Sequence, residues 1–312
     1  MPDPKDVLKK YYNYPAFKGK QEEIINRLLN ENGHCLVLMP TGGGKSICYQ
    51  VPALIFDGGT IVISPLIALM QDQVDTLKMK NIPAEFINST VNPKARRERL
   101  HNFVEGKIKL LYVTPERFRK HEFVESIKKA SVSLLAVDEA HCISEWGHDF
   151  RPDYSRIAEF RELLGNPLTV ALTATATKDV QTDIIAKLGL TKEEIKLFHQ
   201  GIKRPNLRLE AADVFDEKET LNEIIKVLDE YKGHGIIYFS LIKKLEYYSQ
   251  LLSDKGYDHE VYHGKLDSRK RKQTQRDFLS GKQNLILATN AFGMGIDKPD
   301  IRFVIHAEVP SS

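Results

Sequence analysis

The feature that most constrains the fold of this chain is a short apolar run that recurs, ends at a polar residue and precedes a helix-patterned stretch. In the N-terminal part the clearest runs are Cys35–Met39, Thr60–Ser64, Lys109–Val113, Leu134–Val137 and Thr169–Leu172. They are brief and lack strict apolar–polar alternation, which is typical of strands that helices bury on both faces. The runs therefore predict a parallel α/β sheet, whose ligands bind at the carboxyl ends of the strands.

A second, shorter series of runs begins after Arg204 and predicts a second α/β domain. Its strands are expected at 235–239, 259–262, 284–288 and 303–306, separated by helices at 217–231, 241–254 and 267–280. A length of 312 residues also favours two domains over one. We expect domains at 1–203 and 204–312, joined through a hinge that contains the turn-forming residues Gly201 and Pro205.

Composition narrows the class of protein. The net charge is only +3, so a nucleic-acid surface would have to come from local basic patches. Cys35, Cys48 and Cys142 form no CxxC pair, so we expect free thiols in a reducing compartment, without zinc or disulfides. The N-terminus lacks a signal peptide's apolar core. No run approaches the roughly 20 apolar residues that cross a bilayer. We expect a soluble intracellular protein with no membrane partner.

Nucleotide binding is indicated by a glycine-rich turn between the first run and a helix-compatible stretch. The turn consists of Thr41, Gly42, Gly43, Gly44, Lys45 and Ser46. Glycines let backbone N–H groups converge on phosphate oxygens, and the positive end of the following helix faces the same charge. Lys45 would reach the β- and γ-phosphates of ATP, and the Ser46 hydroxyl would bind Mg²⁺. The strict pattern has glycine where this chain has Met39, and the alternative is a chance Gly-Lys-Ser in a glycine-rich turn.

An acidic segment directly after the run Leu134–Val137 indicates hydrolysis. Asp138 is predicted to hold the metal, mostly through water, and Glu139 to orient and polarise the attacking water. His141 completes the Asp-Glu-Ala-His segment and is grouped with these catalytic residues. The alternative for the acidic pair is the capping of a helix N-terminus.

Together these segments resemble those of superfamily 2 helicases, and others resemble the RecQ DNA helicases in particular. The others are Ser64–Gln73, Tyr112–Glu116, the aromatic-rich stretch Cys142–Pro152, Ala171–Ala176 and Ala288–Pro299. The resemblance implies two tandem RecA-like parallel-sheet domains that form an ATP-dependent 3′→5′ DNA helicase motor. It also implies action in DNA repair or recombination, in the cytoplasm, the nucleus or a bacterial nucleoid.

The resemblance assigns further contacts to ATP. Tyr14 falls where the family stacks an aromatic ring on adenine, and Gln21 where it reads the adenine edge. Lys18 stands where the family prefers arginine, which puts that contact in doubt because lysine lacks the planar guanidinium. Packing in the core is the alternative for Tyr14 and Phe17.

The resemblance also assigns contacts to single-stranded or duplex DNA, namely Ser64, Gln73, Thr114, Trp146, Phe150 and Arg151. Trp146 and Phe150 would stack on bases, at about 1–3 kcal/mol per base, and Arg151 would contact phosphate or bridge toward the nucleotide. Packing of Trp146 onto its own domain is the alternative. The basic clusters within 94–99 and 265–272 are either phosphate contacts or solvated helix faces.

Members of the family carry a late arginine-finger motif that resembles Gln-x-x-Gly-Arg-Ala-Gly-Arg. These 312 residues reach Ser312 before such a motif. Because arginine fingers supply about 10³–10⁵ in turnover, the expectation is a motor core with an incomplete second sheet and weak hydrolysis and unwinding. The family's zinc-binding, winged-helix and C-terminal helical regions are expected to be missing too. Two other hypotheses stay open, a module that binds ATP and DNA without unwinding, and an RNA helicase or remodeller.

Overall fold

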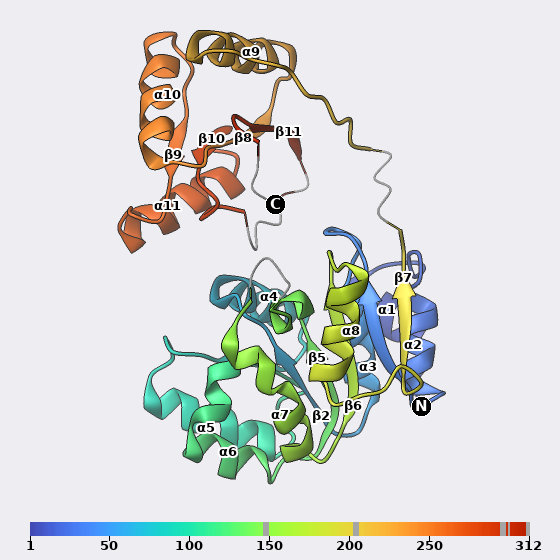
Figure 1. Ribbon diagram of the computed structural model, residues 1–312. Helices are drawn as coiled ribbons and strands as arrows, with labels where there is room; N and C mark the ends of the chain where they lie inside the picture. Colours follow the sequence, from blue (N-terminus) through green and yellow to red (C-terminus); the bar gives the residue numbers. More distant parts are fainter. Residues whose placement is uncertain (146–149, 202–205, 294–297, 299, 310–312) are drawn as a thin grey trace. The chain divides into compact units, whose positions relative to one another are not determined.

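The computed structural model describes residues 1–145, 150–201, 206–293, 298 and 300–309. The chain divides into two compact units, Met1–Arg204 and Pro205–Ser312 (Figure 1). Each unit is an α/β structure around its own parallel sheet. The predicted fold class, two tandem parallel-sheet α/β units, is confirmed.

The first unit is built on a seven-stranded parallel sheet. Its strands, in sheet order, are β3 (Ala84–Ile87), β4 (Leu110–Val113), β2 (Gly59–Ile63), β5 (Val132–Val137), β6 (Leu168–Thr173), β1 (His34–Leu38) and β7 (Ile195–His199). Five of the seven were predicted as apolar runs, whereas the two edge strands, β3 and β7, were not. Neighbouring strands end in register, since Ile63 lies opposite both Val113 and Val137. The residues that follow these strands are therefore gathered at one edge.

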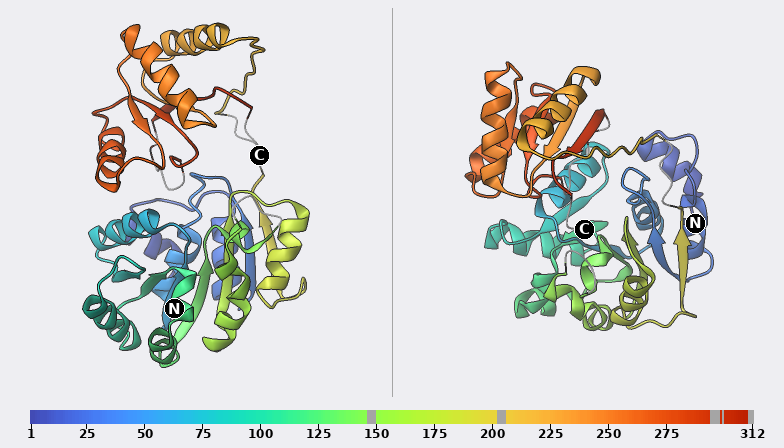
Figure 2. Two further views of the ribbon diagram at one scale, coloured as in Figure 1. Left: turned by 60° about the vertical axis from the view of Figure 1, so that its left-hand side comes forward. Right: turned by 45° about the horizontal axis from the view of Figure 1, so that its top comes forward.

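Helices cover both faces of this sheet, as the views in Figures 1 and 2 show. The first face packs against α1 (Pro4–Tyr12), α2 (Gln21–Leu29), α3 (Ile47–Ile55) and α4 (Ile67–Met79). The other packs against α5 (Pro93–Val104), α6 (His121–Ile127), α7 (Ile157–Leu163) and α8 (Lys178–Lys187). Short 3₁₀ turns, η1 (Pro115–Arg119), η2 (Ala140–Ile143) and η3 (Pro152–Arg156), follow strand ends or loops.

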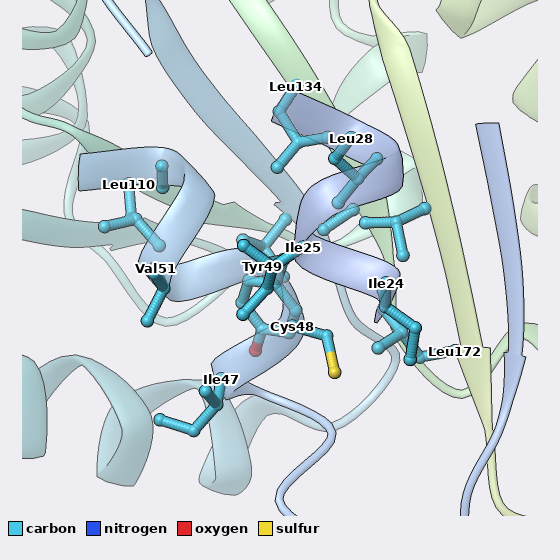
Figure 3. Close-up of a cluster of buried hydrophobic side chains, with 14 of the residues drawn as sticks. Ile24, Ile25, Leu28, Ile47, Cys48, Tyr49, Val51, Leu110, Leu134 and Leu172 are labelled. Carbon is cyan, nitrogen blue, oxygen red and sulfur yellow. The ribbon is translucent and has the colours of Figure 1, made fainter. Parts of the chain in front are cut away.

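Burial on both faces explains why the strands show no apolar–polar alternation. In β1, Cys35 and Val37 belong to one core cluster, whereas Leu36 and Leu38 belong to the other. Figure 3 shows the first cluster, where side chains of α2 and α3 gather around Tyr49 beside Leu110, Leu134 and Leu172 from the strands. The helix that follows the glycine-rich turn is thus anchored in the core.

The second unit has a four-stranded parallel sheet in the order β11 (Ile301–His306), β8 (His234–Tyr238), β10 (Leu285–Ala288) and β9 (Glu260–Tyr262). Side chains of α9 (Glu217–Glu230) and α10 (Ile242–Asp254) pack in one core cluster, and a side chain of α11 (Ser268–Leu279) packs in another. The helices and strands predicted for this part all form, with bounds shifted by at most two residues. In the described part of the chain, no helix has the length and apolar character of a membrane span.

Candidate active site

The segments that were predicted to bind and hydrolyse ATP lie together at the carboxyl edge of the first sheet. The amide of Met39, which opens the glycine-rich turn, donates to the Thr173 carbonyl at the end of β6 over 3.1 Å. The Asp138 amide donates to the Ile63 carbonyl at the end of β2 over 2.8 Å. The phosphate-binding turn and the acidic pair are therefore held by the same sheet, each at the point where its strand ends.

The glycine-rich turn needs glycine at two of its positions. Gly42 and Gly44 have φ angles of 75° and 76°, in the left-handed region that side chains with a Cβ rarely adopt. Gly43 has no such angle, but a Cβ there would lie 2.9 Å from the Pro40 carbonyl oxygen. Gly42 and Gly44 are thus required by their backbone conformation, and Gly43 is favoured by the close approach of the Pro40 carbonyl.

The turn presents hydrogen-bond donors that suit a polyphosphate. Within the described residues, the backbone N–H groups of Gly44, Lys45 and Ser46 donate to no protein acceptor. They stand directly before α3, whose dipole favours negative charge at this end. The Lys45 ammonium donates to the Met39 carbonyl over 3.3 Å. Converging free amides beside a lysine fit phosphate oxygens.

Gln21 lies against this turn and is 4% exposed. Its Nε2 donates to the carbonyl oxygens of Gly44 and Gly43, over 3.0 and 3.4 Å, and its Oε1 accepts from the Lys18 amide over 2.8 Å. The resemblance places Gln21 at the adenine edge, and this contact stays a prediction; the structure shows in addition that Gln21 contacts the phosphate-binding turn. Lys18, in turn, lies with its ammonium 5.8 Å from the centroid of the Tyr14 ring.

Tyr14 and Phe17, for which core packing was the alternative, differ in their burial. Tyr14 is 48% exposed, and its ring stacks with that of Tyr12 at a centroid distance of 6.4 Å. Phe17 is partly buried and packs against the first core cluster. The proposed adenine contact of Tyr14 stays a prediction, and the packing alternative holds for Phe17.

The acidic pair follows β5 with an unusual backbone. Glu139 has φ and ψ of 48° each, a left-handed conformation that is strained for a residue with a Cβ. Burial and the neighbouring Glu139 carboxylate raise the pKa of Asp138 to about 7, against the hydrogen bond from the Glu139 amide and the charge of Lys45. A cation bound at Asp138 would favour its ionised form.

His141 connects the acidic segment with the end of β6. Its Nδ1 lies 2.9 Å from the Thr173 hydroxyl and 3.4 Å from a carboxylate oxygen of Glu139. The Thr173 hydroxyl donates to the Thr175 carbonyl and accepts from the Thr175 amide, so His141 Nδ1 is assigned as a donor. Thr173 was not singled out as a site residue, although the segment Ala171–Ala176 that contains it was.

Three residues predicted to contact DNA have side chains that are buried or partly buried in the first unit. Ser64 and Thr114 are 2% and 3% exposed, and the Thr114 hydroxyl donates to Glu116 over 2.5 Å. Gln73 is partly buried, and its Oε1 accepts from Gln50 over 3.0 Å. A strand lying on this surface would meet the backbone or neighbouring side chains before these groups. Their contact with DNA stays a prediction.

The aromatic-rich stretch is described only in part, and Trp146 lies outside the described residues. Phe150 is partly buried. Arg151 donates from Nη1 to the Pro65 carbonyl over 2.9 Å, and its amide donates to the Cys142 carbonyl over 3.0 Å. The stretch is therefore tied at Arg151 to the loop that precedes α4.

Tyr154 is a supporting residue that no sequence pattern indicated. It is fully buried in η3, and its hydroxyl donates to the Asp138 carbonyl over 3.4 Å. Its position just after Cys142–Pro152 is the only local signal that could have drawn attention to it.

Comparison with known proteins agrees with this geometry. The family model described as DEAD/DEAH box helicase matches residues 18–183, and the one described as helicase conserved C-terminal domain matches residues 216–312. The first match covers the glycine-rich turn, the acidic segment and the end of β6. The chain belongs to the DEAD/DEAH box helicase family.

The named relatives show which group of helicases the chain resembles. The chain is 43% identical over 305 residues to the ATP-dependent DNA helicase RecQ of Bacillus subtilis, covering 97% of this chain and 51% of the relative. It is 40% identical over 306 residues to the RecQ helicase of Haemophilus influenzae, covering 98% and 49%. The predicted resemblance of this helicase-family chain to the RecQ group is confirmed. The chain spans about half the length of these relatives.

Solved structures show the same helicase fold at low identity. Dbp5 of S. cerevisiae, bound to Gle1, matches with a TM-score of 0.72 and 17% identity, over 98% of this chain and 78% of that one. The Lhr helicase of Mycobacterium smegmatis, bound to single-stranded DNA and AMP-PNP, matches with a TM-score of 0.69 and 18% identity, over 98% and 44%. At this identity the likeness concerns the fold.

The site of this helicase-family chain fits ATP with Mg²⁺ by its donor set. The donors are the free amides, Lys45 and the Ser46 hydroxyl, which follow β1, and the Asp138 carboxylate follows β5, with β6 between these two strands of the same sheet. Hydroxyl and carboxylate oxygens are the ligands that Mg²⁺ prefers. No group of three or more His, Cys, Asp and Glu side chains that could hold a metal occurs among the described residues. The expectation about zinc stays a prediction.

Proposed function

We propose that the chain is the ATP-dependent motor core of a RecQ-type DNA helicase, which couples ATP hydrolysis to 3′→5′ movement along single-stranded DNA and to unwinding. The relatives' names support the DNA substrate. The observation that carries the proposal is the gathering of the turn Thr41–Ser46, the pair Asp138–Glu139 and Thr173 at one edge of the first sheet. Residues 1–203 would hold the nucleotide, and 204–312 would form the second motor domain.

The proposed chemistry uses groups that the sheet already positions. Free amides of the turn would bind phosphate oxygens, and Lys45 would leave the Met39 carbonyl to reach the β- and γ-phosphates. Ser46 and Asp138 would hold Mg²⁺, which when bound would supply positive charge against the phosphates. Glu139 would orient the attacking water. His141, held by Thr173, would link this carboxylate to the segment that follows β6.

DNA recognition is proposed to rest on phosphate contacts and base stacking, from Trp146, Phe150 and Arg151 together with basic helix faces. Binding of this kind weakens steeply with salt and has little sequence preference. We place this activity in DNA repair or recombination, in the cytoplasm or nucleus, or on a bacterial nucleoid. The expectation that these 312 residues alone turn ATP over slowly stays part of the proposal.

A steady-state ATPase assay with and without single-stranded DNA tests the proposal. DNA should stimulate turnover, and Lys45→Ala should reduce it by about 10²-fold or more, as loss of a group that stabilises transferring charge does. The control is Lys129→Ala, which removes an exposed lysine just before β5 begins, at the other end of that strand. Turnover that is indifferent to Lys45→Ala, or stimulated by RNA but not by DNA, would refute the proposal. A strand-displacement assay with 3′ and 5′ overhangs tests the direction.

A further inference from the structure

One buried side chain, Gln50, joins three of the segments of the first unit that the proposed function uses. It lies on α3, one turn beyond Ser46, and is 4% exposed. Its amide makes three hydrogen bonds. Nε2 donates to Gln73 Oε1 over 3.0 Å and to the Tyr112 hydroxyl over 3.1 Å, and Oε1 accepts from the Tyr12 hydroxyl over 3.0 Å.

The three partners come from three different elements. Tyr12 ends α1, two residues before the proposed adenine platform Tyr14. Gln73 lies on α4, at the end of the segment proposed to contact DNA. Tyr112 lies on β4, two residues before Thr114. A single amide therefore connects the helix of the phosphate-binding turn with both strand-end segments proposed to face DNA.

The network is neutral and buried. The hydroxyls of Tyr49 and Tyr112 are 3.3 Å apart, which extends the network back to α3. Burial raises the pKa values of Tyr12, Tyr49 and Tyr112 above their ordinary range, so the hydroxyls keep their protons. Figure 3 shows Tyr49 in the middle of the surrounding apolar side chains. A buried network of this kind tolerates few alternative arrangements, because a displaced partner leaves polar groups unpaired.

We propose that Gln50 and Gln73 form a positioning pair that couples occupancy of the phosphate-binding turn to the affinity of the α4 segment for DNA. The inference rests on the proposed function and names its regulation. α3 starts at the turn, and the backbone N–H of Gln50 donates to the Ser46 carbonyl over 2.9 Å, so a shift of Ser46 moves Gln50 with it. The bond to Gln73 then carries that shift to α4.

This assignment gives Gln73 an indirect function. Its Oε1 accepts from Gln50, so the side chain fixes α4 relative to α3 through this bond. A coupling of two sites through such an element is reciprocal, because each ligand must change the affinity for the other by the same factor.

The experiment measures that factor. Fluorescence anisotropy gives the affinity of a labelled oligo-dT for the full chain, with and without saturating AMP-PNP, and the ratio of the two is the coupling factor. We expect a factor of about 5 or more for the unaltered protein. Gln73→Met removes the acceptor and should bring the factor within about twofold of 1. Gln73→Glu keeps an oxygen that accepts from Gln50 and should retain the coupling.

Two further variants make the test specific. Thr76→Met places the same new side chain at an exposed position on α4 and should leave the factor unchanged. Gln50→Met removes the bond to Gln73 together with those to Tyr112 and Tyr12, and it should reduce the factor at least as much as Gln73→Met does. The double variant should have the same factor as Gln50→Met alone, since the bond between Gln50 and Gln73 is already absent there. Fluorescence of the single tryptophan during urea unfolding checks that each variant is folded.

The possible outcomes distinguish a failure of the inference from a failure of the proposed function. If the unaltered chain binds neither AMP-PNP nor oligo-dT, the proposed function is wrong. If it binds both with a factor near 1, or if Gln73→Met keeps the full factor, the inference alone is overturned. A loss of coupling in Gln73→Met that Thr76→Met and Gln73→Glu do not share supports it.

Discussion

Alanine at Gly44 should destabilise the first unit more than alanine at Gly42, although the two glycines share almost the same backbone conformation. Their φ angles of 76° and 75° make the intrinsic penalty for a Cβ nearly equal, at about 1–2 kcal/mol each. Their surroundings differ. A Cβ at Gly42 meets nothing within 4 Å, whereas a Cβ at Gly44 would lie 2.4 Å from Gln21 Nε2.

The difference can be estimated from what Gln21 would lose. To make room, its amide must give up the 3.0 Å bond to the Gly44 carbonyl and the longer contact with Gly43. A hydrogen bond of ordinary length contributes about 0.5–1.5 kcal/mol, and the 3.4 Å contact contributes less. Gly44→Ala should therefore lower the free energy of unfolding by about 1 kcal/mol more than Gly42→Ala does.

Urea unfolding followed by tryptophan fluorescence measures this difference. The chain has one tryptophan, Trp146, within Met1–Arg204, so the signal reports on the first unit. The control is the same pair of substitutions in a Gln21→Ala background, where the two glycines should become equivalent. Equal destabilisation in the original background, or a difference that survives Gln21→Ala, would show that Gln21 does not occupy the space beside Gly44.

Two other predictions concern the acidic side chains. Glu139→Gln should abolish ATP turnover while leaving AMP-PNP affinity within about threefold, because the side chain is proposed to orient water and not to bind phosphate; parallel loss of binding would contradict this. In the second unit, hydrogen bonds from Lys244 and the Ser240 amide lower the pKa of Glu308 from 4.5 to about 2. Its charge therefore stabilises the fold above the unfolded pKa, and this contribution is lost as the pH falls through about 2. Glu308→Gln should flatten the pH dependence of urea unfolding across that window, measured by circular dichroism, whereas Glu246→Gln at an exposed position of α10 should not.

The strands that the sequence predicted are those buried on both faces. Their apolar runs are visible because every position needs an apolar side chain. β3 and β7 were missed because they form the edges of the first sheet. In β7, Ile195 and Phe198 are buried, but Lys196 and Leu197 are exposed, so the strand shows no continuous run. An edge strand gives a weaker signal than a central one for this physical reason.

The candidate site was predictable wherever its chemistry follows directly from a strand end. The turn after β1 and the acids after β5 are local patterns, since spacing along the chain fixes their geometry. The left-handed backbone of Glu139 was not predictable, because nothing in the residue type demands it. It depends on the sheet that holds the preceding strand and on the 3₁₀ turn that follows.

The contacts of Gln21 and Gln50 could not be predicted from local sequence patterns, for a different reason. Gln21 meets carbonyls 22 and 23 residues away, and Gln50 joins partners that are 23, 38 and 62 residues away along the chain. A glutamine on a helix is ordinarily exposed, so its burial is decided only when the sheet sets α1, α3, α4 and β4 side by side. Sequence pattern locates the groups that do chemistry, whereas the packed core decides which polar groups connect them. The regulation of such a motor is therefore expected to lie in residues like Gln50, which carry no motif of their own.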